Sequence, residues 1–424
     1  MPDETKKERA IILNVITGAS PFQEESAGAS ISELKALCEA CHMKTVAVVQ
    51  QRCEKLNPAT YAGKGKILEV KELAGNIEAD CLVVDGQLSG AQMKNLADLT
   101  GLRILDRTLL ILDIFAQRAR TAEGRLQVEL ARLRDQLTRL SGSSAALSRL
   151  GGGIGTRGPG ESQLEMDRRS IRSRSAELSK KLDALEKRRS LAARQRVRRK
   201  AQVFAICGYT NAGKSSLINL LCDSDLLARD QLFATLDPSF RRLPWPGPEV
   251  LLCDTVGFIR DLPHELVEAF KSTLDLVRTA DYIIQVTDLS DPRADEQVEI
   301  VDRILKELGA GDKPRIHVLN KADKVGGSER QKRFYRGRSE TEIPEIPVSI
   351  REGWNIQALT DAMKQLPLRH MQKQDIVLSY ESMDLLNRLH RTSWIESQSF
   401  EEDGIHLRLY TPDYVSSLPE DGKR

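Results

Sequence analysis

The stretch AICGYTNAGKS, residues 205–215, joins an apolar segment to the pattern G-x-x-x-x-G-K-S. The apolar residues Val203–Cys207 predict a buried strand, and Lys214–Leu221 predicts a helix. Between them, consecutive backbone N–H groups must turn inward around a polyphosphate, and glycine permits both the turn and the close approach. We therefore expect a phosphate-binding loop, in which Lys214 reaches the β- and γ-phosphates and Ser215 binds Mg²⁺.

The length and composition of the chain limit the possible classes of protein. At 424 residues the chain is too long for a single hydrophobic core, and about three domains are expected. The 63 basic and 61 acidic side chains give a net charge of only +2, so total charge identifies no partner. The N-terminus carries no basic and apolar leader, and no run approaches the ~18 apolar residues of a membrane span. These features predict a soluble cytoplasmic protein, and seven scattered cysteines suit a reducing compartment.

The segment Cys38-Glu39-Ala40-Cys41-His42 formally matches the haem-attachment pattern C-x-x-C-H. It lies at the end of a stretch, Ser32–Cys41, whose apolar residues recur at helical intervals. We therefore interpret the two cysteines as small core residues of a helix rather than as metal ligands or haem attachment points.

Short apolar runs alternate with helical patterns from Ala10 to about Arg118, which predicts a small parallel α/β domain. The expected strands are Ile11–Ile16, Thr45–Val49, Cys81–Val84 and Arg103–Leu105, and the expected helices are Ile31–Cys41, Gly65–Leu73 and Ala91–Leu99. Within this domain the loop Asn57–Lys66, NPATYAGKGK, enters a helix and could hold a phosphate or cap the helix. We favour the cap.

The next segment predicts a helical hairpin with a glycine-rich tip. Leucines recur every three or four residues among charged residues in 107–140, and a break is expected at Ser141–Ser144. Six of the ten residues Gly151–Gly160 are glycine, and a second long helix follows over Glu161–Lys200. The tip also contains Gly153-x-Gly155-x-x-Gly158, a formal dinucleotide fingerprint, but no strand precedes it. A thin, pliant loop is the better interpretation.

Charge is strongly segregated in the second helix of the hairpin. Residues 168–200 contain fourteen Lys and Arg against three acidic residues. A one-sided basic helix beside a glycine loop that carries Arg157 is typical of an arm that binds a polyanion, although a charged spacer stays open. Few aromatic residues are interleaved, which favours a structured RNA surface over stacking on single-stranded bases.

Two further motifs follow the phosphate loop in the order of a nucleotide switch. Asp254-Thr255-Val256-Gly257 follows the apolar strand Val250–Cys253, so its carboxylate lies at a strand end near Mg²⁺ and the Gly257 N–H can meet a γ-phosphate. Asn320-Lys321-Ala322-Asp323 follows the strand Arg315–Leu319. The Asp323 carboxylate can accept hydrogen bonds from guanine N1–H and N2–H₂, which adenine lacks, so Asp323 predicts GTP as the substrate.

The remaining parts of the nucleotide site are assigned by their position. Ser349-Ile350-Arg351, after the strand Ile346–Val348, is expected to lie behind the base. In Leu232–Pro238, LFATLDP, Thr235 is the expected switch threonine on Mg²⁺, with Ser239 as the second choice.

The residue after Gly257 is Phe258, where Ras-type enzymes carry the glutamine that orients the attacking water. Phenylalanine cannot orient water, so we predict slow intrinsic hydrolysis that a bound partner accelerates. His264, near an expected helix start, could contribute but is better interpreted as a surface residue.

The tail, Met371–Arg424, predicts a strand at Asp375–Tyr380, a helix at Ser382–Leu389 and two strands around Glu401–Gly404. It forms a small α/β domain in this interpretation, and no functional site is predicted in it.

These motifs together resemble the HflX family of the Obg-HflX GTPases. Beyond the general GTPase motifs, the resemblance is carried by the following stretches: NPATYAGKGK (57–66), DRTLLILDIFAQRARTAEGRLQVE (106–129), GGGIGTRGPGE (151–161), LFATLDP (232–238) and DTVGFIRDLP (254–263). The resemblance runs from about Ile11 to Leu366 and implies a factor that binds the large ribosomal subunit. It implies that the hairpin tip reaches toward the peptidyl-transferase region and that stalled ribosomes are separated into subunits, notably in heat stress. ATP use through the N-terminal domain has been linked to the family, and nothing in this sequence establishes it.

The sequence departs from the family pattern at a few positions. Ser239 stands where threonine is usual, and Ile350 replaces the usual alanine after Ser349, which could loosen guanine binding. The C-terminal extension is poorly matched, so its role stays open.

The resulting fold prediction is an α/β protein with a P-loop GTPase domain. Four domains are expected: an N-terminal α/β domain (1–118), a basic helical hairpin (119–200), the GTPase domain (201–368) and a small C-terminal α/β domain (369–424).

The predicted catalytic residues are Lys214, Thr235 and Gly257, and the predicted Mg²⁺ ligands are Ser215, Thr235 and Asp254. The predicted nucleotide-binding residues are Gly208, Tyr209, Thr210, Asn211, Ala212, Gly213, Lys214, Ser215, Ser216, Phe233, Ala234, Thr235, Asp254, Thr255, Val256, Gly257, Asn320, Lys321, Asp323, Ser349, Ile350 and Arg351.

Three functions are compatible with this pattern. The first is a monomeric GTP-hydrolysing factor that splits ribosomes, with Gly151–Gly160 and residues 168–200 on ribosomal RNA. The second is a GTP-gated RNA-binding or assembly module that splits nothing. The third, an ATP-driven RNA-unwinding enzyme, is disfavoured by Asp323.

Overall fold

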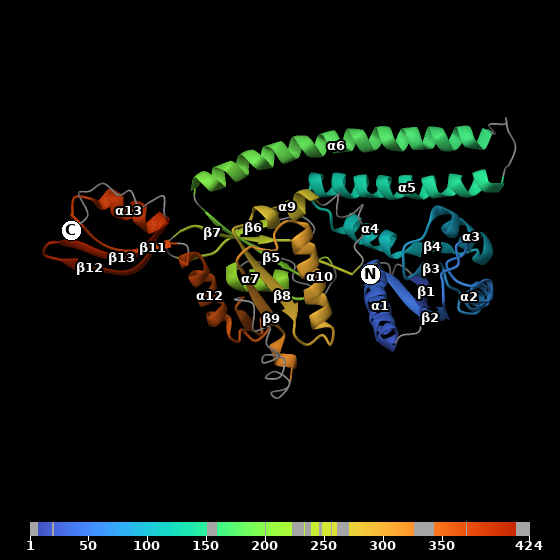
Figure 1. Cartoon of the computed structure of the whole chain (residues 1–424), viewed down its shortest axis with the longest axis horizontal. Helices are drawn as coiled ribbons and strands as arrows, with labels where there is room; N and C mark the ends of the chain where they lie inside the picture. Colours follow the sequence, from blue (N-terminus) through green and yellow to red (C-terminus); the bar gives the residue numbers. More distant parts are fainter. Residues whose placement is uncertain are drawn as a thin grey trace, which may run out of the picture. The chain divides into compact units, whose positions relative to one another are not determined.

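A computed structural model describes most of the chain as two compact units. The described residues are 7–18, 21–150, 159–199, 201–222, 233, 239–245, 248–255, 257–260, 271–325, 343–369 and 371–412. Unit 1 comprises residues 1–185 with 231–233 and 261–270, and unit 2 comprises 186–230, 234–260 and 271–424. Figure 1 identifies the helices and strands of each unit along the chain.

Unit 1 contains a parallel sheet of the order β2-β1-β3-β4 (Figure 1). Its strands are β1 (Glu8–Thr17), β2 (Met43–Cys53), β3 (Cys81–Val84) and β4 (Arg103–Asp106). Its connecting helices are α1 (Pro21–Ala40), α2 (Lys64–Asn76) and α3 (Gly90–Thr100). All four predicted strands and all three predicted helices of this domain are confirmed. The apolar run of β3 is buried throughout, whereas β2, at one edge of the sheet, is only partly buried.

The loop Asn57–Lys66 closes on itself. The Asn57 side chain accepts hydrogen bonds from the backbone N–H of Ala59 and Thr60, at 2.8 and 3.1 Å. The Tyr61 hydroxyl donates to the Asp85 carbonyl at 3.1 Å, although Tyr61 itself has a left-handed φ of 65°. Since its groups bond to the domain and α2 begins directly after it, the loop is an ordered helix entry.

Cys38 lies in the core of unit 1. Its side chain is fully buried, and burial raises the pKa of the thiol to about 11. Cys41 directs its Sγ to the Leu110 carbonyl at 3.5 Å, and burial raises its pKa to about 12. Both thiols therefore stay protonated, as expected for core residues.

The predicted hairpin is present, but its first arm differs from the prediction. The segment expected as one amphipathic helix divides into α4 (Arg107–Arg118) and α5 (Ala122–Leu150), and α6 (Pro159–Arg199) forms the second arm (Figure 1). The break predicted at Ser141–Ser144 is wrong, since α5 continues through it. Glycine and serine weaken a helix by only about 1 kcal/mol or less each, and both retain the N–H that continues the ladder. The glycine-rich tip, residues 151–158, lies outside the described residues.

The two arms lie side by side in unit 1. Arg174 of α6 forms an ion pair with Glu129 of α5 at 2.8 Å, and the Arg168 side chain donates to the Leu140 carbonyl at 2.8 Å. Leu178 of α6 is fully buried. These contacts run antiparallel along the two helices, which is the geometry of a hairpin.

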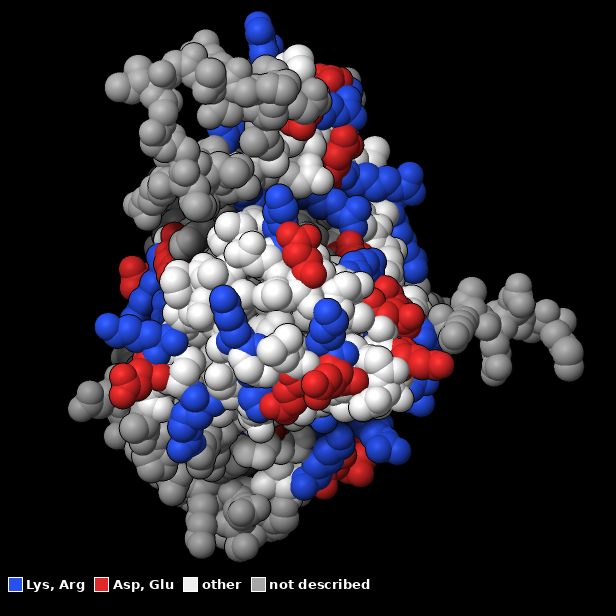
Figure 2. Space-filling model, turned by 90° about the vertical axis from the view of Figure 1, so that its right-hand side faces the viewer, with Lys and Arg blue, Asp and Glu red and all other residues white. Residues whose placement is uncertain are grey.

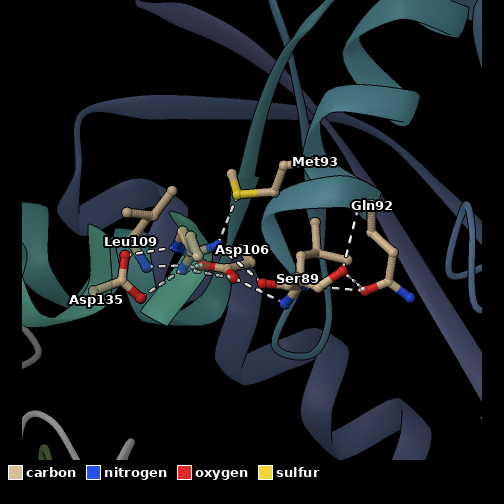
Figure 3. A network of polar contacts seen from close by, with 8 residues as sticks. Ser89, Gln92, Met93, Asp106, Leu109 and Asp135 are labelled. Carbon is tan, nitrogen blue, oxygen red and sulfur yellow. Dashed lines mark hydrogen bonds and ion pairs between the residues drawn. The ribbon is translucent and has the colours of Figure 1, made fainter. Parts of the chain in front are cut away.

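Arg139 fastens α5 to the N-terminal domain (Figure 3). Its guanidinium pairs with Asp135 at 2.6 Å and with the fully buried Asp106 at 3.0 Å, and it donates to the Leu88 carbonyl at 3.1 Å. Asp106 also caps α4 by accepting from the Leu109 N–H at 3.0 Å. Through Arg139, α5 is therefore attached to the loop before α3, to β4 and to the N-terminus of α4.

Phe233 belongs to unit 1, although it falls in the segment between the phosphate loop and Asp254. Its ring packs edge-on against Phe115 of α4, with 4.7 Å between ring centroids, and both rings are almost fully buried. Its φ of 53° is left-handed, which is unusual for a bulky residue.

Unit 2 contains a second sheet, of the order β10-β9-β8-β5-β7-β6 (Figure 1). Its strands are β5 (Gln202–Gly208), β6 (Ser239–Arg242), β7 (Val250–Asp254), β8 (Tyr282–Asp288), β9 (Arg315–Asn320) and β10 (Glu345–Pro347). Its helical elements are α7 (Lys214–Cys222), α9 (Lys271–Thr279), α10 (Ala294–Glu307), the 3₁₀ turn η1 (Ala322–Lys324) and α12 (Ile356–Leu368). All pairings are parallel except that of β6 with β7, so the carboxyl ends of β5, β7, β8 and β9 lie at one edge. The α/β fold with a P-loop domain is thus confirmed.

The tail of unit 2 forms a separate antiparallel sheet of the order β11-β13-β12. Its elements are β11 (Met371–Leu378), α13 (Met383–Thr392), β12 (Trp394–Glu401) and β13 (Gly404–Pro412). Trp394 packs against Trp245, which follows β6, with 6.2 Å between ring centroids. This stack joins the small sheet to the GTPase sheet.

None of the helices in the described part of the chain is long and apolar enough to cross a membrane. On the face of the molecule shown in Figure 2, Lys and Arg side chains are interspersed with Asp and Glu around a broad neutral area. That mixture contrasts with the one-sided basic composition of residues 168–200.

Candidate functional site

The phosphate loop lies where β5 ends and α7 begins, as predicted. Two glycines in it are required by the backbone: Gly208 has a φ of 149° and Gly213 a φ of 98°. A Cβ atom at Gly208 would lie 2.1 Å from the Val286 carbonyl oxygen, and one at Gly213 would lie 2.3 Å from Nδ2 of Asn320. Asn211 adopts the left-handed region at 61°, which asparagine tolerates better than most residues. The loop therefore has the tight backbone that a phosphate cradle needs.

Lys214 points back over this loop. Its Nζ donates to the carbonyls of Tyr209 at 2.8 Å and Gly208 at 3.1 Å, and the residue is only 7% exposed. Desolvation by burial lowers the pKa of the ammonium to about 8, and the Asp254 charge opposes that shift. A polyphosphate at this place would supply the negative charge that favours the ammonium form.

Ser215 and Asp254 meet at the carboxyl ends of β5 and β7. The Ser215 hydroxyl donates to Oδ2 of the fully buried Asp254 at 3.3 Å. The Thr255 hydroxyl donates to the Ile206 carbonyl at 2.6 Å and so anchors the turn after β7. A hydroxyl beside a carboxylate is a set of hard oxygen donors, which suits Mg²⁺.

The residues after Asp254 lie directly on the phosphate loop. A Cβ atom at Gly257 would lie 2.9 Å from Nζ of Lys214 and 3.0 Å from Cγ2 of Thr210, so a side chain there would have to displace the lysine ammonium and press against Thr210. Phe258 is 1% exposed and its backbone bonds to Gly208 and Thr210. The buried ring of Phe258 is not available to orient water, in agreement with the sequence analysis.

The predicted base-recognition residues are brought together by hydrogen bonds between loops. The Asn320 amide donates to the Ala212 carbonyl at 2.8 Å and accepts from the Ile350 N–H at 3.3 Å. The buried Ser349 hydroxyl donates to Oδ1 of Asp323 at 2.7 Å, and this bond lowers the pKa of the carboxyl. Asp323 is thus held as the carboxylate that can accept from guanine.

The other predicted nucleotide-binding residues divide into those the structure describes and those it does not. Ser216 lies in the first turn of α7, Arg351 is exposed after Ile350, and Ser239 begins β6. Phe233 packs in unit 1 as described above. Ala234, Thr235, Val256 and His264 lie outside the described residues, so the assignment of Thr235 to Mg²⁺ stays a prediction.

Two contributors to the site were not predicted from sequence. Asp288, the last residue of β8, forms an ion pair with Lys321 at 2.7 Å, and Lys321 has a left-handed φ of 60°. The backbone N–H of Arg260 donates to the Tyr209 hydroxyl at 2.8 Å. An acidic residue at the carboxyl end of a parallel strand was a usable signal for Asp288. The partner of the Tyr209 hydroxyl, by contrast, is the backbone N–H of Arg260, which no motif marks.

Three family models match successive parts of the chain. They are described as GTP-binding GTPase N-terminal (residues 28–116), GTP-binding GTPase Middle Region (118–196) and 50S ribosome-binding GTPase (203–321).

Curated relatives match over nearly the whole length. A protein named GTPase HflX from Caldanaerobacter subterraneus subsp. tengcongensis is 44% identical over 407 residues, which cover 95% of this chain and 90% of the relative. GTPase HflX from Escherichia coli K12 is 37% identical over 408 residues, covering 96% of this chain and 94% of the relative. Among solved structures, a GTP-binding protein from the archaeon Sulfolobus solfataricus in complex with GDP is 26% identical, with a TM-score of 0.45 over 85% of this chain and 98% of that one. On these relatives and the site described above, the chain belongs to the HflX family of GTPases and is an enzyme that hydrolyses GTP.

Proposed function

We propose that this GTPase binds the large ribosomal subunit through its hairpin arm. It then separates stalled ribosomes into subunits in a GTP-dependent manner, mainly during heat stress. It acts in the cytoplasm, as a monomer. The observation that carries the proposal is the charge of the arm, with fourteen basic and three acidic residues in 168–200. The match of residues 203–321 to a model described as 50S ribosome-binding GTPase supports the same partner.

The described part of the arm supports a partner rich in phosphate. Arg174 and Lys181 pair with acidic residues of the hairpin itself, Glu129 and Glu177, at 2.7 to 2.8 Å. Other cations of the same helix, including Arg169 and Lys180, are exposed. A long helix that presents cations along its length can neutralise a series of RNA phosphates, and the loop Gly151–Gly160 would enter a narrow site near the peptidyl-transferase region.

The nucleotide site would control this arm. In the proposed arrangement Ser215, Thr235 and Asp254 hold Mg²⁺, which neutralises charge on the β- and γ-phosphate oxygens when bound. Lys214 supplies a second positive charge, the Gly257 N–H meets the γ-phosphate, and Asn320 and Asp323 select guanine. Phe258 stands where other GTPases have the glutamine, and in the proposed mechanism the ribosome supplies or orders the group that positions water.

Sedimentation of intact ribosomes tests the proposal directly. Ribosomes are mixed with the protein and either GTP or a non-hydrolysable analogue and separated on a sucrose gradient. Conversion of the 70S peak into subunits, with the protein on the large subunit, is the expected result. Co-migration of the protein with undissociated ribosomes in both conditions would instead indicate a GTP-gated binding or assembly module.

Neutralisation of the arm tests its role separately. The substitutions Arg196→Gln, Arg198→Gln and Arg199→Gln should weaken ribosome association and reduce the dependence of log Kd on log salt, while GDP affinity stays unchanged. A matched control neutralises Arg303, Lys306 and Arg388, which are exposed basic residues outside the arm. Equal losses in both triple variants would show that general charge, rather than the arm, governs association.

A further inference from the structure

The phosphate loop and the segment after Asp254 are joined by more than the neighbouring strands β5 and β7. The Phe258 N–H donates to the Gly208 carbonyl at 3.0 Å, and the Thr210 N–H donates to the Phe258 carbonyl at 2.8 Å. These two bonds make an isolated parallel bridge between Tyr209 and Phe258. The Arg260 N–H then donates to the Tyr209 hydroxyl at 2.8 Å, two residues further along.

The surroundings of the Tyr209 side chain favour its hydrogen bond with the Arg260 N–H. The residue is 7% exposed, and the neighbouring Phe258 and Ile259 are each 1% exposed, so the ring is enclosed. A buried tyrosine hydroxyl needs a hydrogen-bond partner, and here a backbone amide provides it. Phenylalanine at 209 would keep the packing of the ring and the backbone bridge but would lose the bond to residue 260.

The segment that Tyr209 holds includes the glycine on which the reaction depends. Gly257 precedes the bridge directly, and a Cβ atom at this position would lie only 2.9 Å from Nζ of Lys214 and 3.0 Å from Cγ2 of Thr210. Its N–H is expected to meet the γ-phosphate, which GDP lacks. A group that fixes the position of residues 257–260 therefore acts on bound GTP and on hydrolysis, and it has little influence on GDP.

We propose that the Tyr209 hydroxyl is a positioning group of this GTPase, which fixes residues 257–260 against the phosphate loop through the Arg260 amide and so sets the Gly257 N–H for the γ-phosphate. In this role the Tyr209 side chain acts only through the segment it holds, while the Tyr209 backbone remains part of the predicted phosphate loop.

The test compares GDP and GTP in single-residue variants. In Tyr209→Phe, GDP affinity should change less than twofold. Affinity for a non-hydrolysable GTP analogue and the single-turnover hydrolysis rate should each fall by about two- to tenfold, the range for one hydrogen bond. Fluorescent nucleotide titration and quenched single turnovers measure these quantities on the full-length protein.

Two variants at position 260 separate the amide from the side chain. Arg260→Ala keeps the backbone N–H but removes the ion pair of Arg260 with Glu296, which spans 2.7 Å, so its ratio of GDP to GTP-analogue affinity should match the unmodified protein. Arg260→Pro removes the N–H and should reproduce the effect of Tyr209→Phe, with no further loss when the two are combined. An unchanged ratio in Tyr209→Phe, or an equal loss of GDP and GTP-analogue affinity, would overturn the proposal, the second because it indicates general damage to the phosphate loop.

Discussion

The Ser349 hydroxyl donates a hydrogen bond of 2.7 Å to Oδ1 of Asp323. The donor is fully buried, and the bond lowers the pKa of the Asp323 carboxyl. The aspartate predicted to recognise guanine is therefore held in the ionised form that the prediction requires. A serine in one loop thus sets the chemistry of an aspartate in another.

Removal of that donor should weaken guanine binding without changing its specificity. In Ser349→Ala the Asp323 carboxylate loses a partner and an orientation constraint, so GDP affinity should fall by about two- to tenfold. Fluorescent GDP titration measures the change. Ser397→Ala, at an exposed position of β12, is the control and should bind GDP as the unmodified protein does.

Replacement of the aspartate should change which nucleotide is used. Asp323→Asn offers guanine an amide donor where an acceptor is needed, so GTP hydrolysis should be lost and xanthosine triphosphate should be preferred. Hydrolysis of both nucleotides by the same variant is the measurement. Undiminished GTP hydrolysis in this variant would contradict the assignment of Asp323 to the base.

Removal of the Ser215 hydroxyl should raise the Mg²⁺ concentration that GTP hydrolysis requires. Since Ser215→Ala removes one of the few protein oxygens available to Mg²⁺, the Mg²⁺ concentration for half-maximal GTP hydrolysis should rise by about tenfold. Ser215→Thr keeps the hydroxyl and should restore the unmodified requirement. An identical Mg²⁺ dependence in the alanine variant would exclude Ser215 as a ligand.

Loss of the Arg139 side chain, which attaches α5 to the N-terminal domain, should destabilise unit 1. Arg139→Ala leaves Asp106 and Asp135 buried without their guanidinium, so the free energy of unfolding of unit 1 should fall by about 3 kcal/mol or more. Arg132 is a matched control on the same helix, because its pair with Asp113 is exposed and should contribute less than about 1 kcal/mol. Because Trp245, Trp354 and Trp394 all lie in unit 2, the measurement is hydrogen exchange of the backbone amides of unit 1, followed by mass spectrometry in increasing urea. Equal losses in the two variants would contradict a special role for Arg139.

The parts of the fold and site that sequence predicts well are those in which backbone demands restrict residue type. Gly208 and Gly213 stand where φ is left-handed and a Cβ atom would collide with neighbouring atoms. Asp254 and Asn320 are the last residues of β7 and β9, and Lys214 begins α7. Apolar runs between helical patterns located all four strands of the sheet in unit 1 and β5, β7, β9 and β10 of the larger sheet in unit 2, whereas β6 and β8 were not predicted. In these cases few other structures or functions are compatible with the same residue types at the same spacing.

The parts that sequence did not predict depend on contacts between distant segments. Asp288 reaches Lys321, and the Tyr209 hydroxyl meets a backbone amide 51 residues away in the chain. Neither partner is marked by a local pattern. The predicted break in α5 failed for the opposite reason, since a local signal at Gly142 was overridden by the long helix on either side of it.

Arg139 also sets the rotation of α5 about its own axis. A helix turns by about 100° and rises by 1.5 Å for each residue, so the azimuth of every side chain beyond Arg139 on α5 is set by the number of residues that separate it from this anchored position. Insertion of one residue after Leu140 would rotate the far end of the helix by about 100° without disturbing the anchor, whereas insertion of seven would leave it within about 20° of its original direction. The azimuth of the far end of α5 is therefore determined by the number of residues between it and Arg139.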